Sequence, residues 1–234
     1  MNIAVMQPYF FPYIGYFQLI NAVDKFVFYD DVNYIKQGWI NRNRILVNKS
    51  DFMVTVPIEK ADSFKLINET RINTRLYNTW KEKLLVTLNL NYKKAPYFDN
   101  TYNLIREVLE GGHDSISNLA IASVTAVSDA LGINTRFTVA SKDYCNKGLP
   151  REERLIDICK TESAKQYINA SGGEELYSKE SFEKQGIQLD FIKSLPIQYS
   201  QFSGDFVPWL SIIDVMMFNS EATVHTMLKE YQLK

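Results

Sequence analysis

The stretch that decides the fold lies near the amino terminus and reads Gln7-Pro8-Tyr9-Phe10-Phe11-Pro12-Tyr13-Ile14-Gly15-Tyr16-Phe17-Gln18-Leu19-Ile20. It follows a short apolar run at residues 3–6, which is typical of a buried strand. Two prolines and a glycine then interrupt regular structure before an apolar pattern resumes at Phe17. The pattern therefore predicts a strand, a tight aromatic turn and a helix over about 16–22.

The next segment places polar groups beside the end of this first strand. Residues 25–29 are aromatic and β-branched, which predicts a second strand, and Asp30 and Asp31 follow it. A strand–helix–strand unit crosses over with one hand, so the two strands are expected to be neighbours and parallel. Their carboxyl ends then meet at one edge of the sheet. We expect Gln7, Asp30 and Asp31 to line that edge as catalytic residues, although adjacent acids also suit a plain turn.

The aromatic turn itself has the composition of a binding loop. In an α/β sheet, the loop that leaves the carboxyl end of a strand is where ligands bind. Tyr9, Tyr13 and Tyr16 offer ring faces with polar tips, and Gly15 opens a helix whose N-terminus attracts anions. We predict that these four residues contact a substrate. The alternative is that the aromatic rings only close the end of the core.

A second group of binding candidates lies between residues 33 and 45. Arginine side chains bind phosphates and carboxylates through a planar fork, and an exposed tryptophan face suits a sugar or a base. The candidates are Lys36, Trp39, Asn41, Arg42 and Arg44. Arg42 and Arg44 alternate with apolar residues, so they should share one face of a strand. The alternative is that both arginines face solvent at a strand edge, as charges usually do.

The remaining chain alternates helices and strands. We expect a hairpin with strands at 46–47 and 52–58 around a turn at 48–51, then helices over 80–90, 99–109 and 117–131. Strands at 133–140, 166–170 and 187–192 alternate with helices over 151–159 and 178–185, and 141–150 is expected as a loop. This order predicts one α/β domain over 1–234 with a mostly parallel, Rossmann-like sheet. A hairpin and helical insertion occupies about 45–112.

Two further places have local signals. Gly172 and Gly173 follow the strand at 166–170, where glycines let a backbone approach a phosphate, so both are substrate-binding candidates, although a simple turn explains them as well. Near the carboxyl terminus, Ser211 and Asp214 fit a helix-capping box with Asp in place of Glu. Trp209 precedes them and is expected in the core.

Composition limits the classes of function. Lys and Arg number 26 and Asp and Glu 27, so the net charge does not indicate a nucleic-acid binder. The two cysteines have no metal-ligand spacing, which predicts a reducing, cytoplasmic setting and no metal site. No apolar run reaches spanning length, and no early segment has the pattern of a signal peptide, so membrane insertion is not expected. The sequence names neither a cofactor nor an oligomeric state.

These motifs together resemble the WbqC-like protein family along essentially the whole chain. The matching positions are Gln7-Pro8 with the following Tyr-Pro-Gly-Tyr-Phe pattern, Asp30, 39–43, Thr55-Val56-Pro57, Gly172-Gly173 and 206–214. Members of that family sit among enzymes that build bacterial surface polysaccharide such as O-antigen. The resemblance implies a transferase of O-antigen or lipopolysaccharide biosynthesis that acts on a nucleotide-linked amino sugar. Aminoacyl (glycyl) transfer, forming an amide on the sugar amine, is the activity that it implies.

A second resemblance is to cytidylyltransferase-like (HUP-like) enzymes, which have an H-I-G-H motif after their first strand. Here that place reads Tyr13-Ile14-Gly15-Tyr16, so the glycine and the helix entry match and the histidines do not. A neutral tyrosine donates a hydrogen bond but supplies no charge to a triphosphate. Nucleotide binding is compatible with this pattern. Nucleotidyl transfer is not favoured, because tyrosines replace both histidines of the motif.

Amide formation on a sugar amine needs no nucleophile from the protein, because the amine attacks. The protein must hold donor and acceptor together, accept a proton and stabilise an oxyanion. No Walker-type loop is present to hold ATP, so we expect a donor that is already activated, such as an aminoacyl-tRNA or a thioester. The alternatives are a nucleotidyltransferase or adenylate-forming ligase, and a non-catalytic subunit that binds a sugar nucleotide.

Overall fold

Six strands form one mixed sheet in the order β5–β2–β1–β6–β7–β8. The computed structural model describes residues 1–202 and 204–234. The strands are β1 (Asn2–Met6), β2 (Lys25–Phe28), β5 (Arg136–Val139), β6 (Gln166–Ala170), β7 (Gln188–Ser194) and β8 (Tyr231–Leu233). All neighbouring pairs are parallel except β7 and β8. The chain therefore has a mixed α/β fold with a mostly parallel sheet, as the alternating sequence pattern predicts.

The direction of winding reverses at β1. Helix α1 (Ile14–Asn21) connects β1 to β2 on one side, and β6 pairs with β1 on the other side. The helix begins two residues before the expected start, because Tyr13 holds the extended conformation that ends the aromatic turn. In open α/β sheets the point of reversal is where the loops beyond two strands separate and a ligand can enter.

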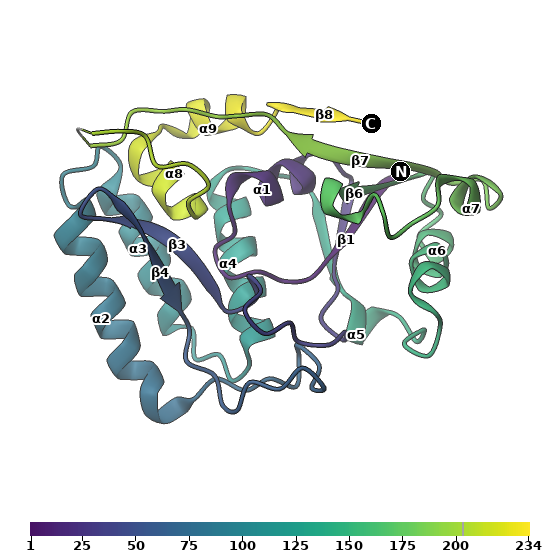
Figure 1. Cartoon of the computed structure of the whole chain (residues 1–234), viewed down its shortest axis with the longest axis horizontal. Coiled ribbons are helices and arrows are strands. Elements are labelled where there is room, and N and C mark those ends of the chain that lie inside the picture. Colours follow the sequence, from purple (N-terminus) through teal and green to yellow (C-terminus); the bar gives the residue numbers. More distant parts are fainter. Residues whose placement is uncertain (203) are drawn as a thin grey trace.

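The sheet is covered on both faces. One face packs on a large core that includes Leu19 and Ile20 of α1 and Leu119 of α4 (Ile116–Ala130). The other face packs on a smaller core with Ile158 of α6 (Arg151–Thr161) and Phe182 of α7 (Lys179–Glu183). Figure 1 shows α6 and α7 beyond β6, away from α4. Because β1 is buried from both sides, its sequence is a continuous apolar run.

The long segment between β2 and β5 carries a separate hairpin and the three longest of the described helices. The hairpin pairs β3 (Arg42–Val47) with β4 (Ser50–Thr55), and α2 (Thr74–Tyr92) and α3 (Phe98–Glu110) follow. The turn contains only Asn48 and Lys49, with φ of 50° and 65°, so the expected turn over 48–51 was too long. Two left-handed residues match the twist of the flanking strands, and this lets pairing begin at Ser50.

Short elements complete the chain. They are α5 (Ala140–Asp143), a 3-10 turn (Ser171–Gly173), α8 (Ile212–Phe218) and α9 (Glu221–Met227). Helix α5 occupies the start of the segment expected as a loop, where the Asp143 carboxylate accepts a hydrogen bond from the Val139 amide at 2.8 Å. Nothing in the apolar pattern predicts this one-turn helix, because a side-chain bond to the backbone stabilises it.

The capping box expected at α8 is only half formed. The Ser211 hydroxyl accepts the Ile213 amide at 3.2 Å, as a cap does. The Asp214 carboxylate instead lies fully buried and accepts hydrogen bonds from Tyr92 at 2.7 Å, Tyr199 at 2.6 Å and the Gln201 amide at 2.8 Å. The Ser211 amide, which a capping box would bind through Asp214, donates to the Arg44 carbonyl at 2.8 Å.

No helix within residues 1–202 and 204–234 combines the length and the apolar character needed to cross a bilayer.

Candidate functional site

The aromatic turn after β1 is held rigidly by its surroundings. Phe11 has φ of 38°, a left-handed conformation that a bulky residue rarely adopts. Its amide donates to the Ser123 hydroxyl at 3.0 Å, and its carbonyl accepts from Ser211 at 2.6 Å and from the Asn43 amide at 2.7 Å. Contacts from α4, β3 and the segment before α8 thus fix the turn, and the side chains that it presents are preorganised.

The rings of the turn divide into two sets. Phe10 and Phe11 are buried and close the end of the core, whereas Tyr9 and Tyr13 are partly exposed. The alternative interpretation, in which the rings only close the end of the core, therefore describes the phenylalanines but not Tyr9 or Tyr13. Tyr16 is also buried, and it donates its hydroxyl to the Gln7 carbonyl at 2.8 Å and packs against Tyr9 with ring centroids 5.5 Å apart.

Gly15 has a steric role in this arrangement. A Cβ atom at this position would overlap both the Tyr13 ring and the Ser194 hydroxyl. The missing side chain therefore lets Tyr13 lie against the first turn of α1. This close approach, rather than contact with a ligand, explains why glycine is needed there.

Trp39 lies beside both arginines of β3. The guanidinium carbons of Arg42 and Arg44 are 5.9 and 5.6 Å from the centroid of its ring. Arg42 donates from Nε to the Gly38 carbonyl at 3.0 Å and from Nη2 to the Gln37 carbonyl, and Gln37 has φ of 61°. Arg42 thus fastens the loop that carries Trp39, while Arg44 reaches toward the aromatic turn.

Trp209 is not in the core, contrary to the expectation from sequence. Its side chain is 56% exposed, and its backbone has φ of 60°. Arg44 Nη2 donates to its carbonyl at 3.2 Å, and its ring meets the Tyr13 ring edge-on at 6.2 Å between centroids. The carbonyl bond and the left-handed backbone direct the indole outward, over the mouth of a pocket.

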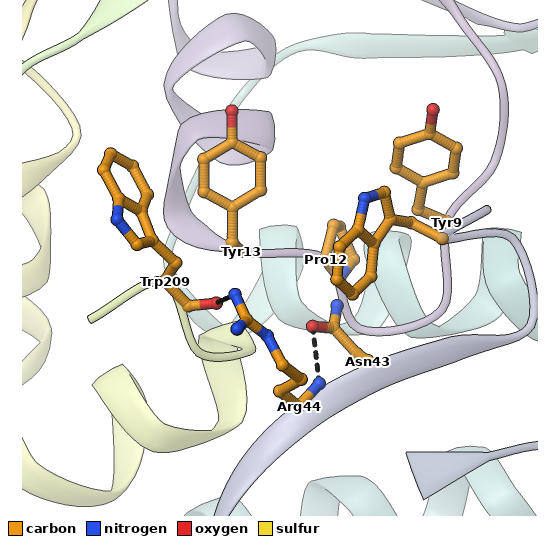
Figure 2. Close-up of a pocket in the computed structure, with 7 residues that line it drawn as sticks. Tyr9, Pro12, Tyr13, Asn43, Arg44 and Trp209 are labelled. Atoms are coloured by element: carbon orange, nitrogen blue, oxygen red, sulfur yellow. Dashed lines mark hydrogen bonds between the residues drawn. The ribbon is translucent and has the colours of Figure 1, made fainter. Parts of the chain in front are cut away.

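Four aromatic side chains and one arginine enclose that pocket, which we call the aromatic pocket. Its volume is about 270 Å³. The lining residues are Tyr9, Pro12, Tyr13, Trp39, Asn43, Arg44 and Trp209. Figure 2 shows Arg44 below the two tyrosine rings, whose hydroxyl groups point away from it. Phe11, Gln37 and Trp209, in the three segments around the site, have left-handed backbone conformations. Backbone strain of this kind is common at functional sites.

Arg44 provides the charge of the pocket. Its Nη1 lies 3.3 Å from the Asp51 carboxylate, and its buried Nε has no hydrogen-bond partner within residues 1–202 and 204–234. A guanidinium with a free, desolvated donor binds an anionic group strongly. Burial raises the pKa of Tyr9 and Tyr13 above the ordinary value of 10.0, so both phenols stay protonated at neutral pH. The pocket thus offers ring faces, neutral donors and one cation.

The two predicted catalytic acids lie at the predicted edge but outside this pocket. Met6 pairs with Phe28, and the Tyr29 amide donates to the Met6 carbonyl at 2.8 Å, so Gln7 and Asp30 follow neighbouring parallel strands. Asp30 accepts from the amide and hydroxyl of Ser141 at 2.9 and 2.7 Å. Its carboxylate is buried, and a catalytic role for Asp30 and Gln7 stays a prediction.

Asp31 is the centre of a buried ion pair. Both of its oxygens accept from Arg154 Nη2, at 2.7 and 2.6 Å, and the two side chains are 6% and 4% exposed. Arg154 also donates to Asn146 at 2.8 Å and lies over the Tyr29 ring at 4.4 Å. This pairing fastens α6 to the carboxyl edge of the sheet. A catalytic role for Asp31 also stays a prediction.

The other predicted binding residues have different settings. Asn41 is buried and joins Tyr34 to the Val56 carbonyl, so it braces the hairpin. Lys36 is exposed near Trp39 in sequence but does not line the pocket. Gly172 and Gly173 form the 3-10 turn after β6, and Gly173 packs against the Asn169 amide, which leaves no room for a Cβ atom.

The structure brings the predicted residues Tyr9, Tyr13, Trp39 and Arg44 together in one pocket, and their contact with a substrate stays a prediction. Three further lining residues were not predicted. Pro12, Asn43 and Trp209 complete the pocket. Asn43 follows Arg42 within the predicted segment, and its position opposite the arginines on the strand is the signal that would have suggested an inward-facing amide. Within the residues that the structure describes, no cluster of His, Cys, Asp and Glu is arranged to hold a metal ion.

Comparisons with known proteins agree with the motif pattern. The chain is 31% identical over 221 residues to "Uncharacterized protein Rv1507c" of Mycobacterium tuberculosis (strain ATCC 25618 / H37Rv), covering 93% of each chain. No solved structure matches it. The model of the WbqC-like protein family matches residues 7–226, a span that includes the aromatic turn, β3 and Trp209. The chain belongs to the WbqC-like protein family.

Proposed function

We propose that this protein binds a nucleotide-linked amino sugar in the aromatic pocket and transfers an acyl group to the sugar amine. The glycyl group that the family resemblance implies is the first donor to test. The observation that carries the proposal is Arg44, which lines a pocket with aromatic walls and whose Nε has no hydrogen-bond partner within residues 1–202 and 204–234. A phosphate oxygen would satisfy this donor, and the rings would stack on a sugar or base.

The shape of the pocket supports a ligand with both a ring and a charge. Trp39 and Arg44 both line the pocket, and the Arg44 guanidinium carbon is 5.6 Å from the Trp39 ring centroid, so a planar or sugar ring bound there would meet an aromatic wall beside a cation. Tyr9 and Tyr13 stay protonated, and their hydroxyls can donate to the hydroxyls of a sugar. An uncharged hydrophobic ligand would offer no acceptor to the Arg44 guanidinium, which makes it a poor fit.

The reaction would require little covalent chemistry from the protein. The sugar amine attacks the carbonyl carbon of an activated acyl donor, a C–N bond forms, and the bond from that carbon to the donor oxygen or sulfur breaks. The amine proton passes to the departing alkoxide or thiolate. Holding the two substrates in register is the main contribution that such a site makes. Asp30 and Asp31 are engaged with Ser141 and Arg154, so the proposal does not use them as bases.

A mass assay with purified protein tests the proposal. We would incubate it with a panel of UDP- and dTDP-linked amino sugars, supplying an acyl thioester, glycyl-tRNA, or glycine with ATP in turn. The expected product is the sugar nucleotide with the mass of the free carboxylic acid or of glycine added, less one water. Arg44→Ala should lose this product, whereas Arg71→Ala, an exposed arginine outside the pocket, should keep it.

Two outcomes would count against acyl transfer. Tight binding of a sugar nucleotide without turnover by any donor would favour a binding subunit. Release of pyrophosphate from CTP or ATP, with no acylated sugar, would favour nucleotidyl transfer. If no sugar nucleotide binds and Arg44→Ala behaves like the wild type, the aromatic pocket is not the substrate site.

A further inference from the structure

A second pocket adjoins the aromatic pocket, and we call it the apolar pocket. Its volume is about 260 Å³, and it shares Tyr13 and Trp209 with the aromatic pocket. Its remaining walls are mostly apolar, and include Ile14, Ile197, Tyr199, Phe206, Leu210 and Val215. Since the two rings of the shared wall are 6.2 Å apart between centroids, ligands in the two pockets would lie on opposite sides of one ring pair.

The apolar pocket is held open by a buried polar network. Asp214 accepts the Tyr199 hydroxyl at 2.6 Å and the Gln201 amide at 2.8 Å. Gln201 in turn donates to the Val207 carbonyl at 3.1 Å and accepts the Val207 amide at 2.9 Å. Tyr199 and Gln201, and Val207 through Gln201, are therefore tied to α8, so these walls of the pocket are fixed before a ligand arrives.

The chemistry of the walls selects an uncharged group. The polar members are Ser194, Gln198 and the hydroxyls of Tyr13 and Tyr199, and no charged side chain lines the pocket in the part of the chain that the structure describes. A charged group placed there would lose its hydration without gaining a counter-ion. An apolar cavity of about 150 Å³ holds a benzene molecule, so this one has room for a short acyl chain.

We propose that the apolar pocket binds the short, uncharged acyl chain of a thioester donor. This inference rests on the proposed function, because it assigns the second substrate of the same site. The sugar amine, reaching past the Tyr13 and Trp209 rings, would attack the thioester carbon. The C–N bond forms, the C–S bond breaks, and the thiolate leaves with the amine proton as a free thiol. The acyl group is an apolar chain rather than glycyl.

The test compares two donors of nearly the same shape. S-propionyl and S-glycyl N-acetylcysteamine differ in a methyl group against an ammonium group, and neither contains a nucleotide that could enter the aromatic pocket. We expect the wild-type protein to bind the propionyl thioester about tenfold more tightly or better, since the ammonium would be desolvated without a partner. Titration calorimetry with each thioester measures the ratio.

Variants at Ile197, which lines only the apolar pocket, locate the binding. Ile197→Trp should fill the pocket and abolish binding of the propionyl thioester, while UDP-sugar affinity stays unchanged. Ile197→Ala should enlarge the pocket and shift the preferred donor toward butyryl and pentanoyl chains, which a purely structural role for Ile197 would not do. If Ile197→Trp fails to fold in a thermal melt, the chain-length shift in Ile197→Ala decides alone.

The outcomes separate this inference from the proposed function. Equal or tighter binding of the glycyl thioester, or a chain-length preference that Ile197→Ala leaves unchanged, overturns the assignment of the apolar pocket. In either case, UDP-sugar binding that still depends on Arg44 leaves the proposed function standing. If the wild-type protein binds the propionyl thioester but no UDP-sugar, the proposed function is overturned and the assignment of the apolar pocket as an acyl site still stands.

Discussion

Arg42 and Arg44 illustrate how two residues of one pattern acquire different tasks. They alternate along β3 and both lie over Trp39, as the strand periodicity predicts. Arg42 donates to the carbonyls of Gln37 and Gly38, whereas the Nε of Arg44 has no hydrogen-bond partner among the residues that the structure describes. The sequence gives no basis for choosing between them, because the choice depends on which loop carbonyls lie within reach.

Arg44→Ala should weaken binding of a UDP-sugar by about 1.5–3 kcal/mol, the usual worth of a hydrogen bond to a charged group. Arg44→Lys should restore only part, because a point charge cannot reproduce a planar fork. Its ion pair with Asp51 is solvent-exposed, so the melting temperature should change little. Calorimetry beside a thermal melt measures both. Arg42→Ala is the matched variant. If it loses as much UDP-sugar affinity as Arg44→Ala, the guanidinium of Arg44 has no special role in binding.

Asp214 gives a prediction about pH. Burial raises the pKa of its carboxyl above the ordinary value of 3.8, against the lowering effect of its three hydrogen bonds. The folded chain therefore holds this proton to higher pH than the unfolded chain, and the stability from this group falls as pH rises from 3.8 through the folded pKa. Asp214→Asn cannot titrate. The difference in unfolding free energy between the wild type and Asp214→Asn should therefore become smaller as the pH rises over that range.

Urea denaturation of the wild type and Asp214→Asn at a series of pH values from 4 upward checks this. Taking the difference between the two proteins removes the contributions of carboxylates that both share. If the stability difference between the two proteins instead grows with rising pH, the hydrogen bonds from Tyr92, Tyr199 and Gln201 lower the pKa of Asp214 by more than burial raises it.

Two glycines make a matched pair of substitutions. Gly15→Ala should destabilise the fold by about 1–3 kcal/mol, as overpacking does, because its Cβ would strike Tyr13 and Ser194. It should also weaken UDP-sugar binding by displacing the Tyr13 wall. At Gly172 a Cβ would meet nothing within 4 Å, so Gly172→Ala should be nearly neutral for stability. A loss of binding in a stable Gly172→Ala would support the predicted backbone contact to phosphate.

At the scale of elements, one buried ion pair joins α6 to the carboxyl edge of the sheet, in addition to the apolar contacts of Ile158. Asp31→Ala would leave the Arg154 charge buried without its partner, and we expect a loss of about 3–5 kcal/mol in unfolding free energy. Asp114→Ala, which breaks the exposed pair with Arg71, should cost less than about 1 kcal/mol. Urea denaturation measures both. An Asp31→Ala protein of normal stability that lacks acyl transfer would instead support the predicted catalytic role.

The elements that the sequence predicted well are those whose burial is periodic. The strands β1, β2, β6 and β7 and the helices α3, α4 and α6 agree with their apolar patterns, because each places apolar side chains in one or both of the two cores. The strand β8 was missed. It contains only Tyr231 to Leu233, and it pairs with the edge of β7 through backbone bonds that leave no side-chain signature.

The site was predicted only where local pattern sufficed. Tyr9, Tyr13, Trp39 and Arg44 were found because each lies in a segment with unusual composition. Trp209 was assigned to the core because its aromatic size favours burial, and no local signal shows that a carbonyl bond to Arg44 turns the indole outward. Asp214 was read as a cap for the same reason: its three partners come from 92, 199 and 201, and the first of these is distant in sequence.

At the scale of the whole molecule, stability should be distributed unevenly. β1 is flanked by β2 and β6 and covered by cores on both faces, whereas β4 has one free edge and exposed residues from Ser50 to Met53. Native-state hydrogen exchange should therefore be slowest for the amides of β1 and much faster for those of β4. Equal protection in the two strands would mean that the hairpin unfolds only together with the six-stranded sheet.

Of the three left-handed residues around the aromatic pocket, Gln37 and Trp209 are exposed, so changing them sacrifices no core packing. Glycine would relieve about 1–2 kcal/mol of backbone strain at each. A laboratory selection for heat resistance alone should therefore enrich Gln37→Gly and Trp209→Gly, and the survivors should bind UDP-sugars poorly. If natural relatives keep bulky residues at both positions, selection in them acts on ligand binding and not on thermal stability.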